Sequence, residues 1–275
     1  DLDGAALDDS LNTINATAAN GGILVDLSAV ADAETTTATS QSFTFTSGSG
    51  KDVVTNFVGQ MQTSTFTLGA GNDTFDMAAS DFHTGHTTPT ITVNAGDGND
   101  TIDVSDSTTL KSEGTISIST GAGADTVKIS GVAANQTGVT ITDFTVGAGG
   151  DKIDLATNAA QMNTTDPVSG YSETTTIADT MGLVVTGTAV AAGGSATAAQ
   201  VGAALTVGTF DGGGGTADAI YVAYDDGINT YFGLLTSDGS NDGFTGDAFV
   251  HMLTLTGVAD ATTLSVDNFT DFLSI

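Results

Sequence analysis

The chain has 275 residues, and its 33 acidic residues against four basic ones give a formal net charge of −29. Nucleic acids and anionic membrane surfaces repel such a chain, so neither is expected as a partner, and we expect no membrane insertion, because no apolar stretch is long enough. The absence of cysteine excludes disulfides and thiolate metal sites. Hydrophobic residues make up 39% of the chain and alternate with polar ones, which argues against a disordered acidic tail.

Residues 1–42 contain one strand-like run, Ile23–Val30, and a threonine-rich stretch, Thr35–Ser42. Abundant glycine, threonine and aspartate with only two prolines is typical of strands and turns. We expect one or two coils of a repetitive β structure here. The first residues show no basic segment followed by an apolar one, so either an export signal lies outside this sequence or export does not use an N-terminal one.

A glycine–aspartate motif recurs between residues 43 and 155. Five segments have the form G-x-G-x-D, and they begin at Gly48, Gly69, Gly96, Gly121 and Gly147. An apolar residue stands two positions after each aspartate: Val54, Phe75, Ile102, Val127 and Ile153. Apolar and polar residues alternate on both sides of each motif, as in half-buried strands.

The spacing of these motifs predicts an all-β fold, a parallel β-roll or β-solenoid. Successive motifs start 21, 27, 25 and 26 residues apart, which is enough for one coil with two strands and two corners. The first corner is always G-x-G-x-D, whereas the second is polar and variable in length, as loops are. One coil cannot bury its apolar face alone, but stacked coils share a continuous core.

The pattern changes beyond about Ala156. Residues 157–180 are polar and irregular, and Ala196–Leu205 is compatible with a short helix. The predicted strands are Met181–Thr186, Ala204–Phe210, Ala219–Tyr224, Tyr231–Leu235 and Phe249–Leu255. We therefore expect three regions: coils without the motif (1–42), the motif-bearing solenoid (43–165), and a β-rich C-terminal secretion or assembly domain with its own core (166–275).

The corner motif suits a hard cation. Glycine adopts positive φ at low cost and lets backbone carbonyls turn to one side, and the aspartate adds a carboxylate beside them. Calcium takes six to eight oxygen ligands of these mixed kinds. Ordinary β-turns are the alternative, because aspartate and glycine dominate turns. Five corners in register, each with an apolar residue at the same offset, favour calcium.

The corners resemble the nonapeptide of the repeat-in-toxin (RTX) family, G-G-x-G-x-D followed by a large aliphatic residue. The resemblance covers about residues 43–155 and implies a parallel β-roll that binds several Ca²⁺ ions between successive turns. This chain departs from the family pattern in two respects. The motif occurs once per coil instead of every nine residues, which predicts one ladder of ions along one edge, and the first glycine of the nonapeptide is missing.

The resemblance carries the metal ligands over by position. The expected carboxylate ligands are Asp52, Asp73, Asp100, Asp125 and Asp151. Carbonyls of the paired glycines are expected to complete the sites: Gly69, Gly71, Gly96, Gly98, Gly121, Gly123, Gly147 and Gly149. Further carboxylates expected nearby are Asp76, Asp97, Asp103 and Asp154. Lys51 stands beside Asp52 and makes that corner the weakest site.

The last residues, Asp267–Ile275, place acidic residues before a few apolar ones. This resembles the uncleaved signal of type I secretion substrates, and the segment from Ala219 to Val258 is similar to the terminal domain of bacterial S-layer proteins. The resemblance implies export by the type I secretion machinery through the C-terminus. The alternative is a final strand that docks on the C-terminal domain.

The sequence contains neither H-E-x-x-H nor G-x-S-x-G, and we expect no enzyme. The predicted function is that of a secreted, calcium-stabilised structural protein of the bacterial cell surface, the C-terminal part of an S-layer subunit that self-associates into a lattice. Two alternatives remain: the secretion module of a larger RTX enzyme, and the terminal region of an RTX adhesin.

Two further features of the sequence are not explained by this function. His83 and His86 form H-T-G-H in a variable corner, and a solvated loop is the expected interpretation. The many T-x-T runs could form a flat ice-binding ladder, but they are irregularly spaced in the sequence.

Overall fold

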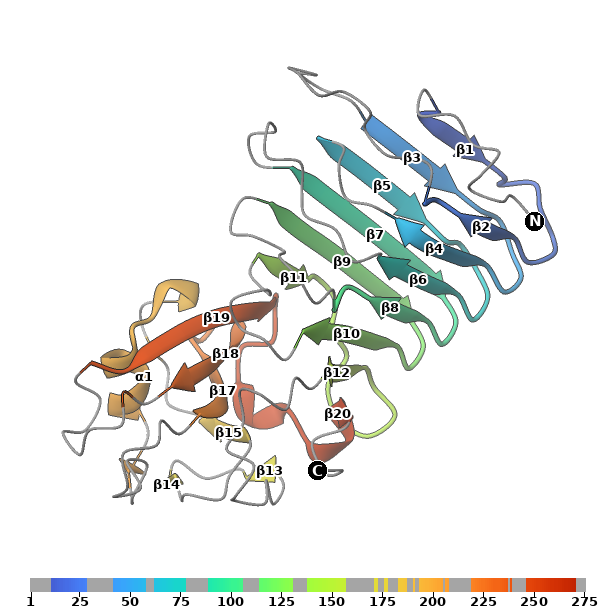
Figure 1. Ribbon diagram of the computed structural model, residues 1–275. Helices are drawn as coiled ribbons and strands as arrows, with labels where there is room; N and C mark the ends of the chain where they lie inside the picture. The colour runs from blue at the N-terminus through green and yellow to red at the C-terminus, as the bar shows by residue number, and fades with distance from the viewer. Residues whose placement is uncertain are drawn as a thin grey trace, which may run out of the picture.

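The computed structural model describes residues 11–28, 42–57, 62–77, 89–105, 114–130, 138–156, 171–172, 176–177, 183–186, 190, 193–204, 206–207, 219–236, 238 and 246–270. These residues form an all-β fold, a parallel β-solenoid whose coils stack side by side (Figure 1). The predicted fold class is therefore confirmed. Among the described residues no helix is long and apolar enough to span a bilayer.

Each coil contributes one strand to each of two sheets. The coil strands of the first sheet are β1 (Thr13–Asn15), β3 (Ser42–Thr46), β5 (Thr63–Thr67), β7 (Thr90–Asp97), β9 (Thr115–Ala122) and β11 (Val139–Ile141). Those of the second sheet are β2 (Leu24–Asp26), β4 (Val53–Phe57), β6 (Thr74–Met77), β8 (Thr101–Asp103), β10 (Thr126–Ser130) and β12 (Lys152–Ala156). Neighbouring coil strands are parallel in both sheets.

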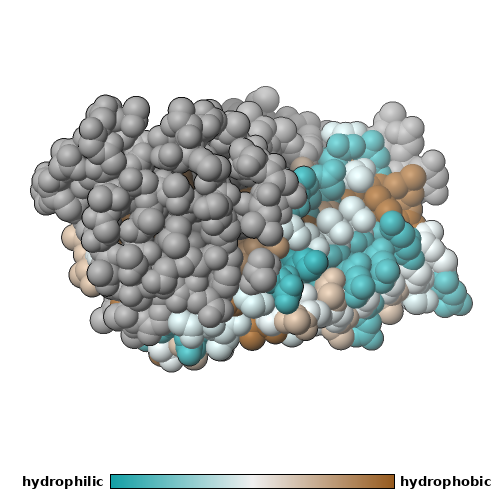
Figure 2. All heavy atoms as spheres, turned by 90° about the horizontal axis from the view of Figure 1, so that it is seen from below, coloured by the Kyte–Doolittle hydropathy of each residue, from teal (hydrophilic) through white to brown (hydrophobic). Residues whose placement is uncertain are grey.

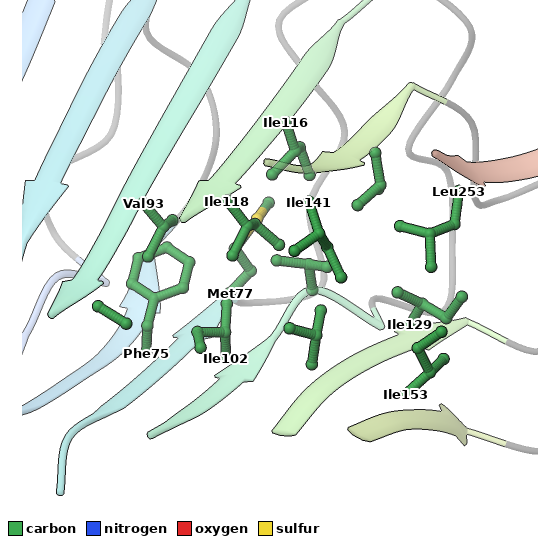
Figure 3. Close-up of a cluster of buried hydrophobic side chains, with 14 of the residues drawn as sticks. Phe75, Met77, Val93, Ile102, Ile116, Ile118, Ile129, Ile141, Ile153 and Leu253 are labelled. Atoms are coloured by element: carbon green, nitrogen blue, oxygen red, sulfur yellow. The ribbon is translucent and has the colours of Figure 1, made fainter. Parts of the chain in front are cut away.

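The two sheets enclose a core built from stacked apolar rows. The residue two positions after each motif aspartate points inward, and these residues pair in register from coil to coil: Val54, Phe75, Ile102, Val127 and Ile153. A facing row on the first sheet contains Phe45, Phe66, Val93, Ile118 and Ile141. All ten side chains are fully buried, and Figure 3 shows how side chains of the two rows meet.

The first coils contain an aromatic cluster. The rings of Phe57 and Phe66 have centroids 4.8 Å apart, and those of Phe66 and Phe75 are 4.6 Å apart. Aromatic pairs at such distances contribute about 0.5–1.5 kcal/mol beyond their buried area. The described part of the face in Figure 2 is mainly hydrophilic or neutral, with apolar colour in small patches.

The C-terminal region continues both sheets. Its elements are β13 (Tyr171–Ser172), β14 (Thr176–Ile177), β15 (Leu183–Thr186), η3 (Gly193–Ser195), α1 (Ala198–Ala204), β16 (Thr206–Val207), β17 (Ala219–Asp225), β18 (Thr230–Thr236), β19 (Ala248–Leu255), η4 (Ala261–Thr263), η5 (Val266–Asn268) and β20 (Phe269–Thr270). Strand β19 pairs in parallel with β11, and β20 pairs in parallel with β12. The last coil is thus covered at both of its sheet edges by the same C-terminal segment.

The C-terminal region contains a small second cluster of buried residues. Val201, Ile220 and Tyr224 belong to it. The opposite face of the same strands, including Tyr221 and Phe232, joins the core of the solenoid. The two regions therefore share one continuous core as well as their sheets.

Candidate cation site

The G-x-G-x-D corners stack so closely that they require glycine. Gly96 and Gly98 have φ angles of 110° and 143°, where side chains other than glycine's are strained. A Cβ atom on Gly98 would lie 1.6 Å from the carbonyl oxygen of Gly71, one coil away. Each of the first four corners therefore rests directly on the backbone of the preceding coil.

Backbone hydrogen bonds connect the stacked corners. The Ala70 N–H donates to the Gly48 carbonyl at 3.0 Å, and the Asp97 N–H donates to the Gly69 carbonyl at 2.9 Å. The carbonyl of Gly69, an expected ligand, thus accepts a bond from the protein itself. A carbonyl oxygen has a second lone pair, so these carbonyls retain capacity for a cation.

The motif aspartates form a continuous ladder inside the corners, and each is at most 2% exposed. We call each of these aspartates a rung. The Oδ1 atom of each rung accepts a hydrogen bond from a backbone N–H of the preceding coil. The donor–acceptor pairs are Ile23–Asp52, Asp52–Asp73, Asp73–Asp100 and Asp100–Asp125 at 2.7 Å, and Asp125–Asp151 at 3.0 Å. One coil step is about 4.7–4.9 Å, so the structure brings all five predicted aspartates into one close row.

The second carboxylate oxygen of four rungs has no hydrogen-bond partner among the described residues. These buried atoms are Oδ2 of Asp52, Asp73, Asp100 and Asp125. A buried carboxylate oxygen without a partner is strongly unfavourable unless a cation or a proton compensates it. The fifth rung differs, because Asp151 Oδ2 accepts from the Thr145 N–H at 2.8 Å and from the Thr120 hydroxyl at 3.0 Å.

The electrostatics of the ladder disfavour bare negative charge. Burial raises the pKa of Asp73 to about 6 and that of Asp125 to about 7, and repulsion from neighbouring rungs adds to both shifts. Burial also raises the pKa of Asp100. The hydrogen bond that each carboxylate accepts opposes the shift but does not cancel it. The row therefore favours a bound cation or proton near neutral pH.

The fifth corner departs from the prediction. Six residues lie between Ile118 and Asp125, whereas nine lie between Ile141 and Asp151, so the fifth corner has three additional residues. A Cβ atom on Gly147 or Gly149 would meet nothing within 4 Å, and neither glycine stacks on the preceding coil. Only the aspartate of this motif joins the ladder.

Two residues that the sequence did not indicate complete this end of the ladder. Asp143 accepts hydrogen bonds from the Thr120 N–H at 2.8 Å and the Gly121 N–H at 3.1 Å. Asn268, fully buried, accepts from the Gly147 N–H at 2.8 Å and donates to the Asp151 carbonyl at 2.8 Å. The three additional residues before Asp151 could have drawn attention to Asp143 in the sequence. No local signal could have identified Asn268, because it lies 117 residues further along the chain than Asp151.

The remaining predicted carboxylates are not brought to this row. Asp76 and Asp103 follow an inward-facing apolar residue directly, so they point outward from the second sheet, and Asp154 holds the equivalent position. Asp103 is 3.2 Å from the Lys128 ammonium group. Asp97 lies on the exposed side of its corner. His83 and His86 fall outside the described residues.

The ligand atoms that the ladder offers a metal ion are carboxylate and carbonyl oxygens, which suit hard cations such as calcium. Within the described ranges no group of three or more acidic or histidine side chains converges on one point. A cation here would therefore take oxygens from adjacent rungs and from the backbone. The four partnerless oxygens are of the chemical kind that such an ion binds. Neither family models nor curated proteins gave a match to this chain.

Proposed function

We propose that this chain is the C-terminal, calcium-stabilised part of a secreted structural protein of the bacterial cell surface. The observation that carries the proposal is the ladder of four buried carboxylate oxygens without a hydrogen-bond partner. Asp52, Asp73, Asp100 and Asp125 would hold the ions, with carbonyls of the stacked corners beside them. Calcium would supply the positive charge that the corner lacks.

The location outside the cell follows from the affinity expected of such sites. Extracellular calcium modules bind at about 10⁻⁴–10⁻³ M, so they fill only where calcium is plentiful. At 1 mM calcium a site with a Kd near 10⁻⁴ M contributes about 1.4 kcal/mol. Sites along the ladder would together contribute on the order of 5 kcal/mol, comparable with the stability of a small domain. The protein would then fold fully only after export.

The contacts of the C-terminal segment support a role in folding. It pairs with the last coil in both sheets, and Asn268 holds the fifth corner. Export by the type I secretion machinery and assembly into an S-layer are the parts of the proposal that rest on the resemblance of the sequence. Self-association in calcium would be visible as ordered sheets by electron microscopy, and persistent monomers at millimolar calcium would count against the S-layer role.

Calcium dependence is tested by thermal unfolding followed by circular dichroism, with EGTA and with about 1 mM calcium. We expect a higher Tm and more β structure in calcium. Magnesium at the same concentration is the matched control, because it demands tighter octahedral geometry and keeps its water. Identical unfolding in EGTA and in calcium would refute the proposed ion ladder and leave protonation as the compensation of the carboxylates.

A further inference from the structure

The outward face of the first sheet carries hydroxyl and amide side chains in register. The central row has one such residue on seven successive strands: Thr13, Thr44, Thr65, Thr92, Ser117, Thr140 and Thr254. Two flanking rows are Ser42, Thr63, Thr90 and Thr115 on one side, and Asn15, Thr46, Thr67, Asn94 and Ser119 on the other. We call these three rows the threonine face.

The threonine face has no charged side chain at these positions, although the chain carries a net charge of −29. The outward face of the second sheet differs. There Asp76, Asp103, Lys128 and Asp154 stand in one row. The two sheets have the same pairing and lie in the same coils, so the solenoid itself does not require an uncharged outer surface.

The face is periodic in two directions. Adjacent strands are about 4.7–4.9 Å apart, and alternate residues along a strand are about 6.6–6.8 Å apart. Strands β3, β5, β7 and β9 lie side by side and nearly parallel in Figure 1. Threonine is β-branched and restricted at χ1, so its methyl and hydroxyl groups repeat at fixed positions. The T-x-T runs are irregular in the sequence only because second corners of different length separate them.

We propose that the threonine face binds ice. An ice surface is uncharged, flat and periodic, with repeat distances close to those of a β-sheet in both directions, and ordered hydroxyl and methyl groups can hold water in the same arrangement. A protein partner is less well matched, because the rows offer neither the aromatic or arginine anchors nor the charges that dominate protein interfaces. This inference is independent of the calcium ladder.

The test compares two variants from one coil. Thr65 lies in the central row on β5, and Thr74 lies on the outward face of the second sheet on β6; both are half-buried. Thr65→Lys places a charge in the threonine face, whereas Thr74→Lys makes the same change outside it. The full chain and both variants are fluorescently labelled, checked for equal Tm, and measured for partition into slowly grown polycrystalline ice and for inhibition of ice recrystallisation.

We expect the unaltered chain and Thr74→Lys to enter ice several-fold more than serum albumin, and Thr65→Lys to lose most of this enrichment. Exclusion of the unaltered chain at the level of albumin would overturn the proposal, as would equal enrichment of the two variants. Sedimentation velocity provides the second readout. A dimer that Thr65→Lys alone dissociates, without any enrichment in ice, would overturn ice binding in favour of a second copy of the chain as the partner.

Discussion

Replacing Asp100 by asparagine tests the ladder at a central rung. The new side chain keeps an oxygen that can accept from the Asp73 N–H, a bond of 2.7 Å in the native chain. It removes the buried oxygen that has no partner. Asp100 lies between two neighbouring rungs, so a cation on either side would lose a ligand. With about 1.4 kcal/mol for each site at 1 mM calcium, the loss in calcium is about 3 kcal/mol.

This loss corresponds to a Tm lower by about 5–10 °C for a chain of this size. In EGTA the same substitution is expected to cost little or to stabilise, because a buried charge disappears. The matched control is Asp103→Asn, on the outer face of the same coil. Its contact with Lys128, at 3.2 Å, is partly exposed, so the change costs about 0–1 kcal/mol with or without calcium.

The assay is urea unfolding followed by circular dichroism, with each protein measured in EGTA and in calcium. The calcium-dependent increment in the free energy of unfolding is compared among the native chain and the two variants. An equal increment in Asp100→Asn and Asp103→Asn would refute the assignment of the ions to the ladder. So would an Asp100→Asn protein with an undiminished increment.

Three further predictions follow from the corners. In EGTA, the free energy of unfolding should fall as pH rises from about 4 through 7. The reason is that Asp73 and Asp125 hold protons in the folded chain, with pKa values of about 6 and 7 against 3.8 for an ordinary aspartate. Urea midpoints that rise with pH over this range would contradict the raised pKa values. Gly98→Ala should destabilise the chain by more than about 2 kcal/mol, because the new Cβ would meet the backbone of the neighbouring coil. Gly149→Ala should cost only about 1 kcal/mol, because there is open space at its Cβ. Thermal unfolding of both variants distinguishes a stacked corner from an unstacked one. Asn268→Ala should cost about 2–3 kcal/mol through the loss of its buried hydrogen bonds, and an unchanged Tm would show that the C-terminal segment does not hold the last corner.

The coil and its core could be predicted from the sequence because each coil repeats the same local pattern. The aspartate and the apolar residue two positions later both face inward, as in Asp73 and Phe75. The same alternation places Asp76 outward, so its absence from the corner could also have been foreseen. The hydrogen bonds between rungs could not be predicted, because the motif spacing does not determine which carboxylate oxygen accepts from which N–H.

The end of the solenoid was beyond prediction for a different reason. Strands β19 and β20 pair with coil strands more than one hundred residues earlier in the chain. No local pattern encodes such a pairing, and loop lengths of this size leave many alternatives open. The fifth corner shows the same effect: Gly147 repeats the motif, but its N–H donates to Asn268, which lies 121 residues further along the chain.

Equilibrium dialysis against calcium near pH 8 tests the ion ladder most directly. The ladder predicts binding of up to four ions, one between each pair of neighbouring aspartates among the five, with affinities of about 10⁻⁴–10⁻³ M. Binding should weaken as pH falls through the pKa values of Asp125 and Asp73, about 7 and 6, because protons compete for the same oxygens. No more calcium bound by the native chain than by Asp100→Asn, at any pH, would contradict the account.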